Sequence, residues 1–174
     1  LNTPVIDFHC HVGRWNRFGG DDDPVEYLRI MDAAGVDRAC VFCSNFGDAR
    51  RGNDLVARFI EKYPDRFIGV AYVTPRSIDE AMSELERCFE TLDFKFLKVY
   101  PDYFGKSIDD STYAPIFQWA NERNLVIMSH SSGPSKGASP VGSGRYRGVN
   151  PSGENDFTWP TRFIGIAQRY QQIK

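Results

Sequence analysis

Two histidines near the start of the chain have the residue type and the spacing of a metal-binding pair. His9 and His11 lie within Pro-Val-Ile-Asp-Phe-His-Cys-His-Val-Gly, residues 4–13. The apolar, β-branched lead of this segment is typical of a strand. Side chains alternate between the faces of a strand, so the pattern predicts that Asp7, His9 and His11 share one face. Two such imidazoles can bind the same metal ion, and Asp7 is placed to orient one of them.

A third histidine ends one further segment with strand character, and a lysine lies near the end of another. His130 follows Val-Ile-Met-Ser, and Lys98 lies within Phe-Leu-Lys-Val-Tyr-Pro, where it shares a face with Tyr100. In parallel α/β folds, functional side chains gather at the carboxyl ends of the strands. We therefore expect His130 and Lys98 to lie at the same edge of the sheet as the histidine pair. The alternative for each histidine is a polar side chain with no metal role.

The segment Asp-Phe-His-Cys-His-Val-Gly resembles the first strand of the amidohydrolase superfamily. The resemblance is to the amidohydrolase-related branch (amidohydrolase family 2), which also contains metal-dependent decarboxylases. It implies that His9, His11 and His130 bind one divalent metal ion, zinc in the first place, with Fe, Mn, Co or Ni as alternatives. Three histidines with one open position are typical of a catalytic zinc site. The ion would lower the pKa of a bound water or polarise a substrate carbonyl.

Lys98 has three interpretations. A lysine in a barrel interior is costly unless it is paired or functional, so a structural ion pair with Asp7 is one alternative. The family resemblance implies two others, a carboxylated lysine that bridges two metal ions and a basic group that holds a substrate carboxylate. We expect the last, with one metal ion, and therefore predict that Lys98 is catalytic.

Residues beyond the strand ends are predicted to bind the substrate, a small molecule that carries a carboxylate. Arg14 and Trp15 follow the histidine pair, and Tyr100 ends the fourth strand-like segment. Arg145 lies in the Gly-, Ser- and Pro-rich segment 131–159, which is long for a connection between a strand and a helix. The alternative for this segment is a solvated loop.

The apolar pattern predicts an α/β fold. Segments with strand character begin near residues 5, 36, 67, 94 and 125, and helical patterns begin near 24, 53, 78, 111 and 160. A period of about 30 residues is that of a βα unit. Short, strongly apolar strands indicate a parallel sheet that is covered on both faces. We therefore expect a partial TIM (β/α)8 barrel with about five βα units.

A complete (β/α)8 barrel has eight units and about 250 residues. Residues 1–174 are thus predicted to form a single domain, the N-terminal portion of a barrel, with Ile173 and Lys174 leading into a sixth strand. The family resemblance also implies a sixth-strand histidine and an eighth-strand aspartate, for which the chain offers no candidates, so we expect it to be incomplete for catalysis. Unpaired sheet edges predict self-association, as a homo-oligomer.

Composition excludes several partners. With 21 basic and 23 acidic residues, the net charge of -2 makes no electrostatic case for nucleic acid or a membrane surface. No apolar run approaches the ~20 residues of a membrane span. Cys40 and Cys43 have C-x-x-C spacing inside a predicted strand, where they point to opposite faces, and are expected to be buried thiols. Reduced thiols predict a cytoplasmic protein.

The expected activity is hydrolysis of a small cyclic ester, lactone or amide by metal-activated water. The first alternative, on the same scaffold, is non-oxidative decarboxylation of an aromatic or unsaturated carboxylic acid. A nuclease-like member fits less well, because that branch places a metal-binding glutamate where this chain has Lys98. The alternative from another class is an inactive fragment that self-associates.

Overall fold

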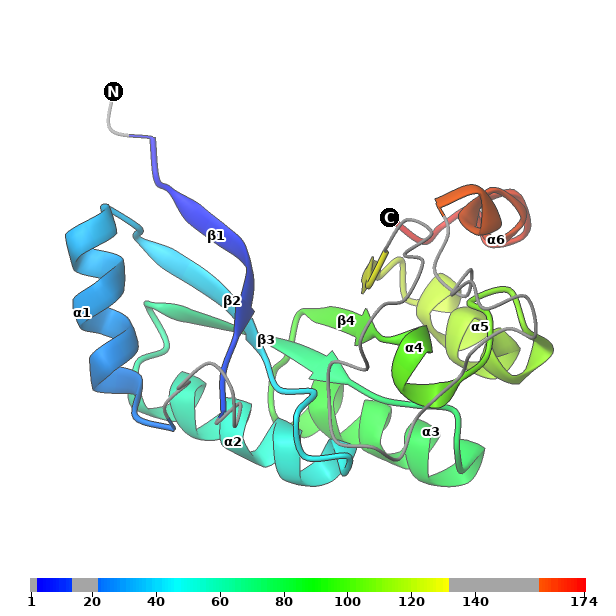
Figure 1. The fold of residues 1–174 in the computed structure, drawn as a ribbon, viewed down its shortest axis with the longest axis horizontal. Helices are drawn as coiled ribbons and strands as arrows, with labels where there is room; N and C mark the ends of the chain where they lie inside the picture. Colours follow the sequence, from blue (N-terminus) through cyan, green and yellow to red (C-terminus); the bar gives the residue numbers. More distant parts are fainter. Residues whose placement is uncertain (1–2, 14–21, 132–159) are drawn as a thin grey trace, which may run out of the picture. The chain divides into compact units, whose positions relative to one another are not determined.

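The structure is a computed structural model that describes residues 3–13, 22–131 and 160–174. The chain divides into two compact units (Figure 1). Unit 1 comprises Leu1–Tyr72 and Glu84–Lys95, and unit 2 comprises Val73–Ser83 and Phe96–Lys174.

Three parallel strands form the sheet of unit 1. They are β1 (Ile6–His11), β2 (Arg38–Phe42) and β3 (Phe67–Tyr72), paired in chain order. The residues of β2 after Arg38 are at most 1% exposed, which accounts for the absence of polar alternation in this strand. Helix α2 (Ala49–Lys62) covers β2 and β3 (Figure 1) and contributes Leu55, Val56 and Phe59 to the core.

The helices of unit 1 begin at aspartates. Helix α1 (Pro24–Ala34) starts after Asp23, whose side chain accepts a hydrogen bond from the main-chain N–H of Val25, and it ends at Gly35 with φ 69°. Helix α2 starts after Asp48, four residues before the predicted start at 53. The apolar pattern missed its first turn because that turn is polar.

Unit 2 contains the second strand pair, β4 (Phe96–Val99) and β5 (Val126–Ser129), again parallel. Around them lie shorter elements: α4 (Pro101–Phe104), a 3-10 turn (Ser111–Tyr113), α5 (Ala114–Glu122), a second 3-10 turn (Pro160–Arg162) and α6 (Phe163–Arg169). Helix α3 (Ile78–Glu86) continues into a π-helical turn (Arg87–Thr91).

Helix α6 follows a 3-10 turn at residue 160, where a helical pattern was expected to begin. Its apolar residues are mostly not buried, and Ala167 is exposed. Tyr170, which ends the helix, is buried and has a ring contact with Phe117 of α5.

The last residue continues the β pairing of unit 2. The main-chain N–H of Lys174 donates to the carbonyl of Leu125, and the N–H of Ile127 donates to the carbonyl of Lys174, at 3.0 and 2.9 Å. These two bonds are those of a parallel bridge to β5. Lys174 thus lies beside β5 as a parallel neighbour.

Strands and helices thus alternate along the chain with every strand pair parallel, which confirms the predicted α/β class and the partial (β/α)8 organisation. None of the helices in the described ranges has the length and apolar character needed to span a membrane.

Candidate metal centre

A β-bulge in β1 decides which side chains share the face of the histidine pair. Asp7 is paired with Ala39, and His11 is paired with Phe42. Between these pairs β1 advances four residues (7 to 11) and β2 only three (39 to 42), so β1 carries one extra residue. Paired residues of parallel strands point to the same face, and Ala39 and Phe42 point to opposite faces. Asp7 therefore lies on the face opposite His11.

The predicted role of Asp7 is accordingly wrong. Its carboxylate accepts a hydrogen bond from the main-chain N–H of His9, with a distance of 2.9 Å between N and Oδ1. Strict alternation along β1 would have placed Asp7 beside the imidazoles, but the extra residue of the bulge shifts the alternation by one position. The carboxylate braces the bulged main chain and does not orient a ring.

His9 and His11 converge at the carboxyl end of β1. Their Nε2 atoms lie 3.3 Å apart, and their ring centroids 5.3 Å apart. His9 is exposed and His11 is partly buried. Without an ion, a proton on one Nε2 can be donated to the other.

The separation of the two nitrogens fits a shared metal ion. A Zn²⁺ ion bound at 2.0–2.1 Å from each nitrogen with a tetrahedral angle between them requires nitrogens about 3.3 Å apart. The observed distance is 3.3 Å. The distance between the two nitrogens is thus the one that two ligands of a single tetrahedral ion require.

Phe42 and Tyr27 both contact the histidine pair. The Phe42 ring is fully buried, and its centroid lies 5.1 Å from that of His9 and 4.3 Å from that of His11. The Tyr27 hydroxyl of α1 donates to the carbonyl of His11 at 3.0 Å. Sequence reasoning did not single out Phe42, although its place at the end of the second predicted strand was a signal.

In unit 2, the strand register brings Tyr100 and His130 together. β4 and β5 are paired up to Val99 and Ser129, and the main-chain N–H of His130 donates to the carbonyl of Val99 at 3.0 Å. The ladder thus extends one residue beyond the strands, and Tyr100 lies directly opposite His130. Their rings are stacked, with centroids 4.1 Å apart and an interplanar angle of 12°.

Lys98 adjoins the same stack along β4. Its side chain is fully buried, and its Nζ lies 5.3 Å from the centroid of the Tyr100 ring. This contact agrees with the prediction that Lys98 and Tyr100 share a face of the strand. Burial lowers the pKa of Lys98 from 10.5 to about 8, because the charged ammonium loses hydration.

The predicted site residues thus fall into two groups, which are not placed relative to each other. The histidine pair lies in unit 1, and Lys98, Tyr100 and His130 lie together in unit 2. Arg14, Trp15 and Arg145 lie outside the described residues. Within the described ranges, no three or more His, Cys, Asp or Glu side chains are gathered so as to hold a metal ion. The three-histidine site therefore stays a prediction.

The thiols are poor candidates for ligands. Cys40, Cys43 and Cys88 are buried, as expected for Cys40 and Cys43, and Cys10 is partly buried. Burial is the main cause that raises the pKa of Cys10 to about 12 and that of Cys40 to about 11. At neutral pH they remain neutral thiols, whereas metal binding requires the thiolate.

A buried polar cluster in unit 1 was not predicted. The side-chain oxygen of Asn53, in α2, accepts a hydrogen bond from the main-chain N–H of Tyr72 at 2.9 Å. Its side-chain nitrogen donates to the Tyr72 carbonyl at 3.0 Å and to the Glu84 carboxylate at 2.9 Å. Although burial acts to raise it, hydrogen bonds from Arg87 and Asn53 hold the pKa of Glu84 below its usual value. The signal in the sequence was a polar residue three positions before Val56, on the apolar stripe of the helix.

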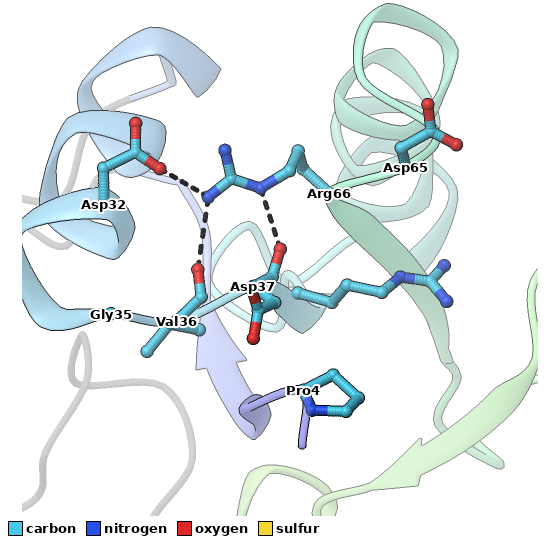
Figure 2. Close-up of a pocket in the computed structure, with 8 residues that line it drawn as sticks. Pro4, Asp32, Gly35, Val36, Asp37, Asp65 and Arg66 are labelled. Atoms are coloured by element: carbon cyan, nitrogen blue, oxygen red, sulfur yellow. Dashed lines mark hydrogen bonds and ion pairs between the residues drawn. The ribbon is translucent and has the colours of Figure 1, made fainter. Parts of the chain in front are cut away.

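Unit 1 also contains a pocket of about 620 Å³, shown in Figure 2. The Arg66 guanidinium in this pocket donates to the Asp32 carboxylate at 2.7 Å and to the main-chain carbonyls of Asp37 and Val36 at 2.8 and 3.2 Å (Figure 2). The pocket is lined by Pro4, Asp32, Gly35, Val36, Asp37, Arg38, Asp65 and Arg66. These residues come from the end of α1 and from the segments just before β1, β2 and β3, so the pocket lies at the amino ends of the strands, whereas the histidine pair lies at the carboxyl end of β1.

Comparison with known proteins identifies a family. The family model described as amidohydrolase matches residues 6–173. A 2-amino-3-carboxymuconate-6-semialdehyde decarboxylase of Dictyostelium discoideum is 27% identical over 78 residues, 45% of this chain and 22% of that protein. A 2-keto-4-carboxy-3-hexenedioate hydratase of Sphingobium sp. is 28% identical over 128 residues, 61% of this chain and 37% of that protein.

Solved structures share the fold. The 2,6-dihydroxybenzoate decarboxylase from Rhizobium aligns with a TM-score of 0.70 and 19% identity, over 98% of this chain and 64% of that one. A 5-carboxyvanillate decarboxylase from Novosphingobium aromaticivorans with bound manganese aligns with a TM-score of 0.67 and 23% identity, over 91% of this chain and 50% of that one. The chain spans less than two thirds of the length of these relatives.

Proposed function

This chain belongs to the amidohydrolase family, and we propose that His9 and His11 are two ligands of a catalytic divalent metal ion, with His130 as a third. The observation that carries the proposal is the 3.3 Å separation of the two Nε2 atoms at the carboxyl end of a parallel strand. Zinc is the first choice of metal because this separation suits a tetrahedral ion. Manganese is the second, since one relative with this fold carries it.

Lys98 is proposed to hold the carboxylate of a small-molecule substrate. With a pKa of about 8, its ammonium is still charged at neutral pH although its side chain is fully buried. A buried positive charge gains most when a carboxylate approaches, because the low local dielectric strengthens their attraction. The ring of Tyr100 lies beside this ammonium, with its centroid 5.3 Å from Nζ.

The reaction that these residues support best is non-oxidative decarboxylation of an aromatic or unsaturated carboxylic acid. Three of the relatives are decarboxylases of such acids by name, and a fourth is a hydratase of an unsaturated acid. When bound, the ion would act as a Lewis acid toward the substrate. The chain's own task is then to fix the substrate carboxylate at Lys98.

Hydrolysis of a lactone, cyclic ester or amide is the second candidate. The family description favours it, since amidohydrolases are hydrolases by name. In that case the histidine ligands would position a water for attack on a carbonyl. The two candidates differ in what Lys98 binds, a carboxylate that is lost as CO₂ or a carboxylate that stays.

The metal assignment is tested by equilibrium dialysis of the purified chain against Zn²⁺ or Mn²⁺, followed by elemental analysis. We expect the parent to retain the metal and the His9→Gln, His11→Gln variant to lose it. Gln171→Ala, on the exposed surface, is the matched control and should bind like the parent. A parent that binds no metal, or a double variant that binds it equally well, would contradict the assignment.

The substrate class is tested by calorimetric titration with 2,6-dihydroxybenzoate, its methyl ester and an uncharged lactone of similar size. We expect the carboxylate to bind and the methyl ester to bind weakly, with the difference lost in Lys98→Met. Binding of the lactone in preference to the acid would favour the hydrolase. Equal binding of acid and ester by the parent would remove the role of Lys98.

A further inference from the structure

Tyr100 and His130 lie at equivalent positions of two neighbouring strands, and this relationship limits what the tyrosine can do. Both follow the last paired residues of β4 and β5, and the hydrogen bond from His130 N–H to the Val99 carbonyl keeps the main chains in register. Neighbouring strands are about 4.8 Å apart. Two flat side chains that leave one face at such positions must lie against each other.

The geometry of the two rings is that of a close stack. The centroids are 4.1 Å apart and the planes differ by only 12°, so the imidazole presents one whole face to the phenol ring. Tyr100 is only 8% exposed, so little of its surface is open to a substrate. Lys98 occupies the neighbouring place on β4, with its Nζ 5.3 Å from the phenol centroid. The tyrosine ring is therefore held by contacts on its own strand and on the next.

We propose that Tyr100 is a positioning residue that fixes the plane of the His130 imidazole, in place of the substrate-binding role expected from its sequence position. A histidine at a strand end can rotate about two side-chain bonds, and only some ring orientations direct a nitrogen lone pair toward a given point. The stack removes the rotations that would tilt the ring out of the plane of its neighbour. Phe42 also lies against a histidine, His11 of unit 1, at 4.3 Å between centroids, but there the ring planes are tilted by 57°.

The stack matters for the proposed function because a metal ligand must be presented in one orientation. Contacts that orient a ligand are worth about 10- to 100-fold in metal affinity. This part of the inference rests on the proposed metal role of His130. The orientation of the ring itself does not, and it can be measured without metal.

The first measurement is proton–carbon NMR of the chain with ring-labelled histidine, without metal. Only three histidines contribute, and His130→Gln assigns the signal of interest. A phenol ring stacked at this distance shifts the His130 ring protons upfield relative to the urea-unfolded chain. We expect this shift in the parent and in Tyr100→Phe, which keeps the ring, and its loss in Tyr100→Leu. Absence of the shift in the folded parent would overturn the inference, whether or not the leucine variant folds.

The second measurement is Zn²⁺ affinity of the same proteins by competition with a chromophoric chelator. We expect Tyr100→Leu to weaken binding about tenfold and Tyr100→Phe to change it by less than about twofold. Equal losses in both variants would assign the effect to the hydroxyl and contradict the positioning role. A parent that binds no Zn²⁺ but shows the upfield shift would refute the metal site and leave the ring orientation established.

Discussion

The Asp7 carboxylate accepts a hydrogen bond from the main-chain N–H of His9, two residues further along the same strand, with N and Oδ1 2.9 Å apart. The bond lies at the bulge that shifts β1 against β2. A carboxylate beside a histidine pair invites assignment as a partner of an imidazole, but here it stabilises the main-chain shape that presents both rings on one face.

Asp7→Asn is therefore expected to leave metal affinity within about twofold of the parent, because the asparagine oxygen still accepts the same N–H. A carboxylate that oriented a ligand imidazole would cost about 10- to 100-fold when neutralised. Zn²⁺ competition titrations measure the difference. Asp7→Ala, which removes the acceptor, is the matched comparison and should weaken binding. A tenfold loss in Asp7→Asn would restore the role of Asp7 as an imidazole partner.

Lys98 should make stability depend on pH in the alkaline range. Its pKa is about 8 in the folded chain and 10.5 in the unfolded chain, so between these values the unfolded chain holds more protons. The free energy of unfolding therefore rises with pH through this window, since burial of the ammonium costs most below pH 8. Lys98→Met should stabilise the chain by about 2 kcal/mol at pH 7.

Denaturant unfolding at pH 7 and at pH 10.5 tests this expectation. The advantage of Lys98→Met should shrink toward zero at the higher pH. Lys95→Met, at an exposed position, is the control and should alter the free energy of unfolding little at either pH. A methionine variant that is less stable than the parent at pH 7 would show that the ammonium has a favourable structural role.

Asn53 joins the end of β3 to α2 and Glu84 through three hydrogen bonds, and its side chain is fully buried. Asn53→Ala leaves the N–H and the carbonyl of Tyr72 buried without these partners. We expect a loss of about 3 kcal/mol in the free energy of unfolding. Asn121→Ala, which removes one exposed hydrogen bond to the main-chain N–H of Gln172, should cost no more than about 1 kcal/mol in the same urea titration. Equal losses in the two variants would mean that burial of the Asn53 amide does not add to its contribution to the free energy of unfolding.

Two helical glycines offer a matched test of the approach of α2 to the end of β2. A Cβ at Gly52 would lie 2.5 Å from the main-chain oxygen of Cys43, whereas a Cβ at Gly165 in α6 meets nothing within 4 Å. Gly165→Ala should stabilise its helix by up to about 1 kcal/mol. Gly52→Ala should instead destabilise the chain, because the main chain of Cys43 cannot move away without disturbing β2. The midpoints of thermal unfolding of the two variants and the parent measure these changes in stability. Stabilisation by Gly52→Ala would contradict the close packing of α2 against Cys43.

The local elements of this chain could be read from the sequence because their causes are local. The strands lie where β-branched and apolar residues are continuous. Helix α1 begins at Pro24, where a helical pattern was predicted to begin, and lies between the Asp23 cap and Gly35. The parallel arrangement followed from the spacing of the strands, since a crossover helix between successive strands permits little else. The candidate residues His9, His11, Lys98 and His130 were found by their residue types and their places at strand ends.

The orientation of those side chains was decided only by the tertiary structure. The bulge that places Asp7 on the face opposite the imidazoles is a property of the pairing between β1 and β2. No sequence pattern within β1 predicts it. The stack of Tyr100 on His130 depends on the register of two strands 30 residues apart. Sequence patterns record which residues alternate along one strand, whereas register depends on hydrogen bonds and packing between strands. Residue types and strand ends thus come from the sequence, and the orientation of the side chains comes from the fold.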